Sequence, residues 1–284
     1  MTHSIASSPS GSTPPAWRPR WAVSTIGDPS ANLTEWMQLC AEWSIDELEL
    51  RTLSGSLDLP KILGATYSSP EAWAAWLRDQ PAQVAVLSTN LRLAVDNPHE
   101  RTALLAHVPW AEAAGIRWLR VFDHIGPLRP WTDDEWTSAI SQYRWWREQR
   151  AQHAWRVDLI IEAHQFLFSP ENYKRFADES KETPALIFDV GHAVRGLGPA
   201  PAIEAWHALE PHAPRIHFKD LSPPNPEGIK HCLPGTGIAP LDRFWEAFAT
   251  TTPRSLTFEW ERQWEPRLPP LVDALTALRK RRWL

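Results

Sequence analysis

The amino-acid sequence predicts an α/β protein folded as a single (β/α)8 TIM barrel, and three observations lead to this expectation. Eight short apolar runs alternate with segments in which apolar residues recur with a helical period. The runs recur about every 25 to 40 residues, and strands that alternate with helices in this way form a parallel sheet. The chain has 284 residues, of which 43% are hydrophobic, and this matches the size and the core of one such barrel.

Each predicted strand is a short run rich in aliphatic and aromatic residues. The four strands of the first half are RWAVSTI (20–26), IDELELR (45–51), AQVAVLS (82–88) and IRWLRVF (116–122). The four strands of the second half are RVDLIIE (156–162), PALIFD (184–189), PRIHFK (214–219) and RSLTFE (254–259).

The segments between the strands carry signals for helices. TDDE (132–135) is a capping box, and SPE (169–171) places serine at a helix cap with proline at the first helical position. A helical apolar period runs through APLDRFWEAFA (239–249). Tryptophan is abundant, with 18 residues, and we expect those at three- and seven-residue steps to pack helices onto the sheet. They are Trp36, Trp43, Trp73 and Trp76.

The amino-acid composition limits the possible domain organisation and the possible classes of binding partner. Residues 1–17 are rich in Ser and Pro without the apolar stretch of a signal peptide, so we expect a disordered leader before one domain at 18–284. Without an export signal, and with only Cys40 and Cys232, a cytoplasmic protein is expected.

No apolar run approaches the ~20 residues of a membrane span. A net charge of −5 disfavours a nucleic-acid partner, and a homo-oligomer stays open.

An open doubly wound sheet is the alternative fold. It is disfavoured because no glycine-rich G-x-G-x-x-G loop follows the first predicted strand.

Metal-ligand residue types stand at the ends of the last four predicted strands. The fifth strand ends in Glu162, the sixth ends in Asp189, the seventh carries His217 and the eighth ends in Glu259. The carboxyl ends of barrel strands meet at one mouth, where active sites lie. We therefore expect three carboxylates and one imidazole to lie close together.

Three neighbouring carboxylates would repel each other, and a divalent cation relieves that repulsion. Oxygen and nitrogen ligands suit Mn²⁺, Mg²⁺, Co²⁺ or Zn²⁺, and the lack of a thiolate ligand disfavours a structural zinc site. A single carboxylate at a strand end is as well explained by a helix cap or a surface charge. Four ligand types on four consecutive strands together predict a metal site.

Two further residues share a side with the predicted ligands. The period-two alternation of a strand places His164 on the same side as Glu162, and Lys219 on the same side as His217. Each also has a structural interpretation. His164 could bond a backbone carbonyl, and Lys219 could form an ion pair with Asp220, itself a candidate cap of the next loop.

The sequence resembles the xylose isomerase-like barrels, a family of sugar isomerases and epimerases, inosose-type dehydratases and endonuclease IV. The resemblance covers most of the chain and rests on five motifs in order. These are IIEAHQF, FDVGHAV, RIHFKDL, PGTG (234–237) and LTFEWE.

The resemblance implies that the metal ligands are Glu162, Asp189, His217 and Glu259. In the ketohexose 3-epimerase branch, the two glutamates also transfer the proton, one on each face of the substrate. The residue equivalent to His192 then contacts substrate oxygens. His231 stands where those epimerases carry arginine, and Lys219 is closer to the dehydratase branch. These departures leave the substrate open.

Endonuclease IV is a remote alternative, because its three-metal cluster needs additional histidine and aspartate ligands. Ile229 stands where one aspartate is expected, and the second and third strands lack the ligand histidines.

The predicted function is therefore a divalent-metal-dependent isomerase or epimerase that acts on a keto sugar or related polyol. Glu162 or Glu259 would remove a proton next to a carbonyl to give an enediolate. A dehydratase or lyase acting on an inosose or 3-keto sugar is the alternative, and a sugar-binding protein without catalysis is a third. Arg51 and Arg120 are candidates for substrate contact or for buried salt bridges. The expected partner is a small sugar or cyclitol.

Overall fold

The eight predicted strands form a closed parallel barrel. The computed structural model describes residues 18–228, 230–250 and 254–284, so the leader expected at 1–17 lies outside the described residues. The strand order is β1-β10-β7-β6-β5-β4-β3-β2, and β1 pairs with both β10 and β2, which closes the barrel. The predicted fold is confirmed, and the open-sheet alternative is wrong. The strands are β1 (Arg20–Ser24), β2 (Glu47–Leu50), β3 (Gln83–Arg92), β4 (Trp118–Phe122), β5 (Asp158–Glu162), β6 (Ala185–Asp189), β7 (Arg215–Phe218) and β10 (Ser255–Phe258).

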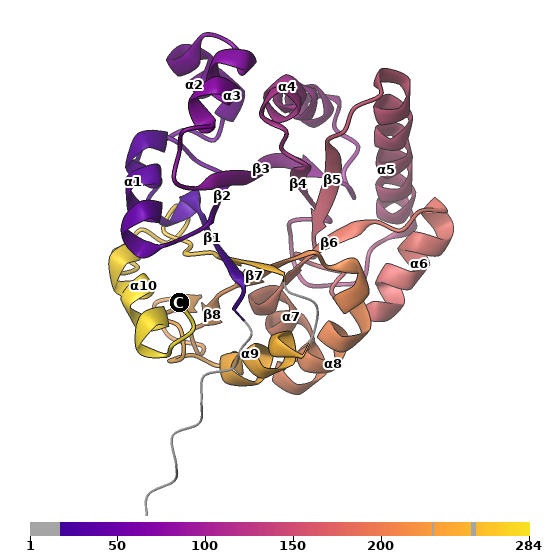
Figure 1. The fold of residues 1–284 in the computed structure, drawn as a ribbon. Coiled ribbons are helices and arrows are strands. Elements are labelled where there is room, and N and C mark those ends of the chain that lie inside the picture. Colours follow the sequence, from indigo (N-terminus) through magenta and orange to yellow (C-terminus); the bar gives the residue numbers. More distant parts are fainter. Residues whose placement is uncertain (1–17, 229, 251–253) are drawn as a thin grey trace, which may run out of the picture.

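The helices form a ring outside the strands (Figure 1). Their order follows the chain, and two helices lie between β2 and β3 and between β6 and β7. No helix in the described part of the chain is long and apolar enough to cross a membrane. The α-helices are α1 (Leu33–Trp43), α2 (Leu59–Tyr67), α3 (Pro70–Leu77), α4 (Pro98–Ala114), α5 (Asp133–His153), α6 (Pro170–Ser180), α7 (Val190–Leu197), α8 (Pro199–Leu209), α9 (Leu241–Ala249) and α10 (Leu271–Lys280). Two short 3-10 helices are η1 (Thr25–Gly27) and η2 (Glu210–His212).

The predicted helix signals are confirmed. Thr132 and Glu135 form the reciprocal capping box at the start of α5, and Ser169 caps α6 with proline at its first position. The tryptophans pack as expected: Trp36, Trp43 and Trp73 are buried in the core between helices and barrel. Cys40 and Cys232 are both free thiols.

Two features differ from the expected strands. β3 continues to Arg92 beyond the predicted end at Ser88, because no glycine or proline interrupts the chain there and Arg92 pairs with Phe122 of β4. A short antiparallel pair, β8 (Asp220–Leu221) and β9 (His231–Cys232), follows β7. Two residues per strand are too few to produce a periodic pattern, so this pair was not predicted.

The inside of the barrel contains both apolar and charged residues. Val86, Ile160 and Ile187 form a small buried cluster contributed by β3, β5 and β6. Arg215 of β7 forms a buried ion pair with Glu47 of β2 at 2.8 Å, and both residues lie at the first position of their strands. Buried charges are therefore not confined to the carboxyl ends of the strands.

Asp220 organises the loop that follows β7. Its carboxylate accepts hydrogen bonds from the backbone N–H groups of Leu221, Gly235, Gly237 and Ala239, at 2.8 to 3.1 Å. Gly235 has a φ of +82°, and a Cβ at Gly237 would lie 2.2 Å from the Leu221 carbonyl oxygen. The PGTG segment is therefore a loop built around one buried carboxylate, as expected for a residue that caps the next loop.

Replacing Asp220 with alanine should lower the free energy of unfolding by about 3 kcal/mol, because four backbone N–H groups lose their acceptor. Urea unfolding monitored by tryptophan fluorescence measures this change. Asp242→Ala is the matched control, because its exposed carboxylate only meets Arg281 at 3.4 Å, and it should change stability by less than about 0.5 kcal/mol. Equal stability of the two variants would contradict the structural role of Asp220.

Candidate metal centre at the barrel mouth

The structure brings together the four residues predicted as metal ligands. Glu162, Asp189 and His217 lie on β5, β6 and β7, and Glu259 directly follows β10. Asp189 is the cross-strand partner of His217. One oxygen or nitrogen of each residue lies within 4.8 Å of those of the other three, and all four residues are buried.

His217 has an orientation suited to ligation. Its Nδ1 atom lies 3.4 Å from Asp189 Oδ2, 3.4 Å from Glu259 Oε2 and 4.0 Å from Glu162 Oε1. Its Nε2 atom lies 3.0 Å from Glu49 Oε2. A hydrogen bond from Nε2–H to Glu49 fixes the ring and leaves the Nδ1 lone pair facing the carboxylates.

The four residues fit a divalent cation. Three buried carboxylates and one imidazole converge, and among the described residues His217 Nδ1 has no hydrogen-bond partner. Glu162 Oε2 is likewise without a hydrogen bond. Unsatisfied buried donors and acceptors are costly, so a group that binds these atoms together would remove that cost. Oxygen and nitrogen donors in this ratio suit a divalent ion.

Lys219 lies beside this cluster, below the cavity floor. Its ammonium contacts Asp189 at 2.9 Å, Glu261 at 2.8 Å, and also Glu259. The expected alternative, an ion pair with Asp220, is wrong, because Asp220 points toward its own loop. Although burial opposes it, Asp189 and Glu259 raise the pKa of Lys219, so this residue is an ammonium ion.

The two glutamates have different electrostatic environments. Burial raises the pKa of Glu162 to about 8, although Arg120 at 3.3 Å opposes this effect. Although burial also opposes it, His217 and Lys219 lower the pKa of Glu259 well below its usual range. Without a bound ion, Glu162 is therefore the glutamate that favours the protonated form, whereas Glu259 stays ionised beside Lys219. Although burial opposes it, Glu259 and Glu49 raise the pKa of His217 well above its usual range, so a bound ion would have to displace a proton from this imidazole.

His164 and His192 form a second group next to Glu162. Their ring centroids are 3.8 Å apart, and His192 Nε2 lies 3.4 Å from Glu162 Oε1. Arg195 Nη2 lies 2.8 Å from His192 Nδ1. Burial lowers the pKa of both imidazoles, so both are neutral. His164 Nδ1 has no hydrogen-bond partner in the described part of the chain, so the expected alternative of a bond from this nitrogen to a backbone carbonyl is not observed.

A cavity of about 460 Å³ opens above the cluster, which is enough for a small molecule. Arg120 lies in its wall, 3.3 Å from Glu162 and 3.8 Å from Glu49, so its salt-bridge interpretation is correct. His231 lies at the rim, where its Nδ1 atom is 2.6 Å from Glu265 Oε1. The predicted residues that line this cavity are Arg51, Arg120, Glu162, His164, His192, His231 and Glu259.

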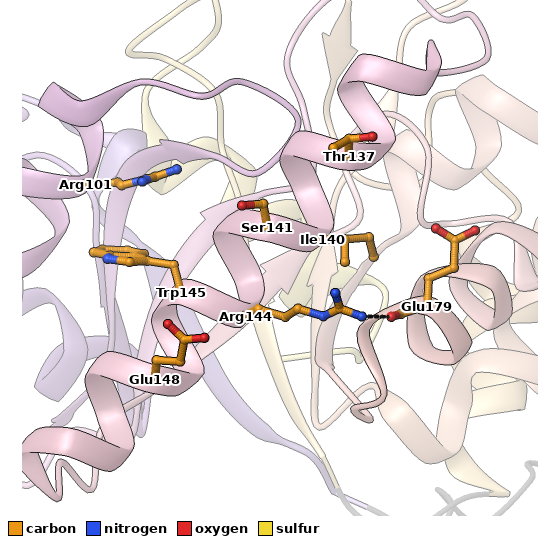
Figure 2. Close-up of a pocket in the computed structure, with 8 residues that line it drawn as sticks. All are labelled: Arg101, Thr137, Ile140, Ser141, Arg144, Trp145, Glu148 and Glu179. Carbon is orange, nitrogen blue, oxygen red and sulfur yellow. Dashed lines mark hydrogen bonds between the residues drawn. The ribbon is translucent and has the colours of Figure 1, made fainter.

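A larger depression of about 680 Å³ lies on the outer helices, where residues of α4, α5 and α6 line it (Figure 2). Its two arginines already have partners. Arg144 donates to the carbonyl of Glu179, as Figure 2 shows, and Arg101 forms an ion pair with Asp96 at 2.6 Å. Within the described residues, this surface lacks a convergent group of ligand atoms, and the candidate site is the cavity at the barrel mouth.

The sequence-based prediction did not assign roles to several residues of this site. Glu49 is two residues before Arg51 on the same strand, and Glu261 is two residues after Glu259. The period-two pattern could have placed both beside the predicted residues. No comparable signal exists for Glu265 or Trp264, which come from the loop after β10.

No protein-family model matches the chain, and no curated protein matches it. Several solved structures, however, are similar to it. The probable 3-DHS dehydratase AsbF of Bacillus anthracis superposes with a TM-score of 0.72 at 16% identity, covering 92% of this chain and 98% of that one. An IolI protein with a bound zinc atom gives 0.70 at 12% identity, over 92% and 95% of the two chains. A D-tagatose 3-epimerase-like protein gives 0.62 at 16% identity, over 92% and 96%.

These identities are low, and the likeness extends over nearly the whole length of each chain. A protein from Planctomyces limnophilus described as a xylose isomerase domain protein also matches, with a TM-score of 0.64 over 95% of this chain. The protein therefore has the fold of the xylose isomerase-like TIM barrels.

Proposed function

We propose that this protein is a divalent-metal-dependent isomerase or epimerase that acts on a keto sugar or related polyol. One observation carries the proposal: four buried donor atoms converge within 4.8 Å on the floor of a cavity that can hold a small sugar. Structural similarity to a zinc-bound protein and to an epimerase-like protein supports the same class.

Glu162, Asp189, His217 and Glu259 would hold the ion. When bound, the ion supplies Lewis acidity, which polarises the substrate carbonyl and makes the neighbouring C–H group acidic. Glu49 would keep the imidazole of His217 in the orientation that ligation requires.

The two cavity-lining glutamates would move the proton. One carboxylate removes the proton next to the carbonyl, which gives an enediolate. Return of a proton to the same carbon from the opposite face gives epimerisation, whereas its return to the neighbouring carbon gives aldose–ketose isomerisation. Glu162 and Glu259 both line the cavity, so both are within reach of a substrate that is bound there.

The surrounding cations and imidazoles would position the substrate and stabilise its charge. His192 and His164 present neutral rings to the cavity and can bond substrate hydroxyl groups. Arg120 and Lys219 place positive charge near the atoms where the enediolate develops.

A dehydratase is the second candidate, and the position of Lys219 beside Glu259 favours it. Glu259 lines the cavity and would pass the proton taken from the substrate to a leaving hydroxyl group, which converts the same enediolate into an unsaturated product and water. The ammonium group of Lys219 would stabilise the carboxylate of Glu259 that remains. The structural similarity to a probable 3-DHS dehydratase is consistent with this reaction.

Proton NMR in deuterated buffer tests the proposal and separates the two candidates. An isomerase or epimerase incorporates solvent deuterium into a keto sugar or inosose without loss of water, whereas a dehydratase forms a conjugated product that absorbs in the ultraviolet. Absence of both signals across keto sugars, inososes and 3-keto-glycosides, with metal present, would contradict the proposed function.

Replacing Glu49 with glutamine should weaken metal binding by about 10- to 100-fold, because His217 loses the carboxylate that orients it. Competitive titration with a chromophoric chelator measures the affinity. Glu42→Gln, on the exposed face of α1, is the matched control and should leave the affinity unchanged. Equal affinities of the Glu49 variant and wild type would show that Glu49 does not orient the ligand.

A further inference from the structure

Arg51 is a buried cation that lines the cavity at the barrel mouth. It directly follows β2 and is only 4% exposed. Its Nη2 atom donates to Asn90 Oδ1 at 2.6 Å, and its Nη1 atom has no hydrogen-bond partner among the described residues. One edge of the guanidinium group is thus held by the protein while the other donor stays unsatisfied.

The other buried cations of the barrel all have carboxylate partners. Arg120 meets Glu162 at 3.3 Å, Lys219 meets Asp189 at 2.9 Å, and Arg215 meets Glu47 at 2.8 Å. Across residues 18–228, 230–250 and 254–284, no carboxylate oxygen lies within 4.0 Å of the guanidinium nitrogens of Arg51. Burial, and next the charge of Arg120, lower the pKa of Arg51 to about 9, although the more distant charges of Glu162, Glu259 and Glu49 oppose this effect. A buried charge without a direct partner costs several kcal/mol, so a ligand that brings a counter-ion into contact with Arg51 would remove that cost.

The surroundings of Arg51 point to a ligand that brings this counter-ion. The guanidinium carbon lies 5.9 Å from the ring centroid of Trp264, whose side chain is 51% exposed at the mouth. Ile26 and Leu57 provide apolar surface in the same cavity. A planar cation held by one amide and bordered by apolar surface is suited to a planar anion.

We propose that the substrate carries a carboxylate group, which Arg51 binds at the wall of the cavity next to Trp264. A carboxylate is favoured over a phosphate because a single guanidinium group with one free donor matches one negative charge, whereas a phosphate dianion needs several donors. This inference rests on the proposed function for the reacting end of the molecule, where Glu162 and Glu259 lie. The substrate class is then a polyhydroxylated keto acid rather than a neutral sugar.

Calorimetric binding of matched acidic and neutral compounds tests the proposal. Glucuronate is compared with glucose, and quinate with myo-inositol. Wild type should bind each acid at least 10-fold more tightly than its neutral partner. The preference should be the same with metal and after chelation, which shows that the acid does not owe its affinity to binding the metal ion.

Arg51→Met should lose this preference and Arg51→Lys should keep part of it. Arg117→Gln, an exposed arginine at the opposite end of the barrel, should retain it in full.

A thermal unfolding scan separates ligand binding from a structural role. Arg51→Met removes a buried charge without a counter-ion, so the unfolding temperature of the ligand-free protein should stay the same or rise. A fall of more than a few degrees would identify Arg51 as a structural residue and overturn the proposal. Equal affinity for acids and neutral compounds, or tighter binding of glucose 6-phosphate than of glucuronate, would also overturn it.

The binding experiments test the carboxylate site separately from the proposed proton-transfer reaction. A protein that exchanges protons on neutral keto sugars, and shows no preference for acids, keeps the proposed function and loses only the carboxylate site. A protein that prefers acids through Arg51 but exchanges no proton keeps the carboxylate site and loses the proposed function.

Discussion

Replacing Glu162 with glutamine should abolish proton exchange on the substrate, with a loss of at least about 10³-fold in kcat. Glutamine has nearly the same shape and keeps one ligating oxygen, but its amide cannot accept a proton at neutral pH. The measurement is deuterium incorporation by proton NMR at saturating metal, with the metal content of the variant determined by elemental analysis. The loss should therefore appear in kcat while the ion stays bound.

Two controls make this result specific. Glu71→Gln, on the exposed start of α3, should keep wild-type turnover, and it shows whether glutamine substitution as such perturbs the protein. An unfolding temperature of the Glu162 variant close to that of wild type excludes a folding defect. Turnover within about threefold of wild type, with metal bound, would remove Glu162 from the mechanism and leave Glu259 as the base.

The strands and the ligand cluster could be predicted because their signals are local. Glu162, Asp189 and Glu259 each end an apolar run, and His217 lies near the end of another. The topology of a parallel barrel brings such positions to one mouth. The capping box at Thr132 is similarly local, because its two partners are three residues apart. Knowing the order of strands and helices is therefore sufficient to place these residues.

The partners of the buried charges could not be predicted, because they depend on how the barrel closes. Glu49 bonds His217 across 168 positions of sequence, and Lys219 reaches Glu261 rather than its neighbour Asp220. Strand alternation gives the side of the sheet on which a residue lies, but not the distance to residues on other strands. The lack of a hydrogen-bond partner for Arg51 Nη1 among the described residues also depends on the three-dimensional arrangement of the strands.

Removal of the metal should abolish the activity and lower the unfolding temperature. The four donors converge only in the folded protein, so an ion that binds them stabilises the native state. The stabilisation is about 2.7 kcal/mol when the concentration of free ion is a hundred times its Kd. In a chain of this size, that corresponds to an increase of roughly 5 to 10 °C. The measurement is differential scanning fluorimetry of protein dialysed against a chelator, before and after addition of Mn²⁺, Mg²⁺, Co²⁺ or Zn²⁺, with NaCl at equal ionic strength as the control.

His217→Gln provides the decisive comparison for this prediction, because it removes the only nitrogen donor of the cluster and leaves the three carboxylates in place. If the ion binds there, the variant should lose most of the thermal shift, while Asp242→Ala on the exposed surface should keep it. A shift of equal size in both variants would assign the ion to a different place on the protein. No shift in wild type with any of the four ions would mean that Lys219 and Arg120 compensate the carboxylates. The cluster would then be a closed salt-bridge network, and the proton-transfer chemistry would lose its Lewis acid.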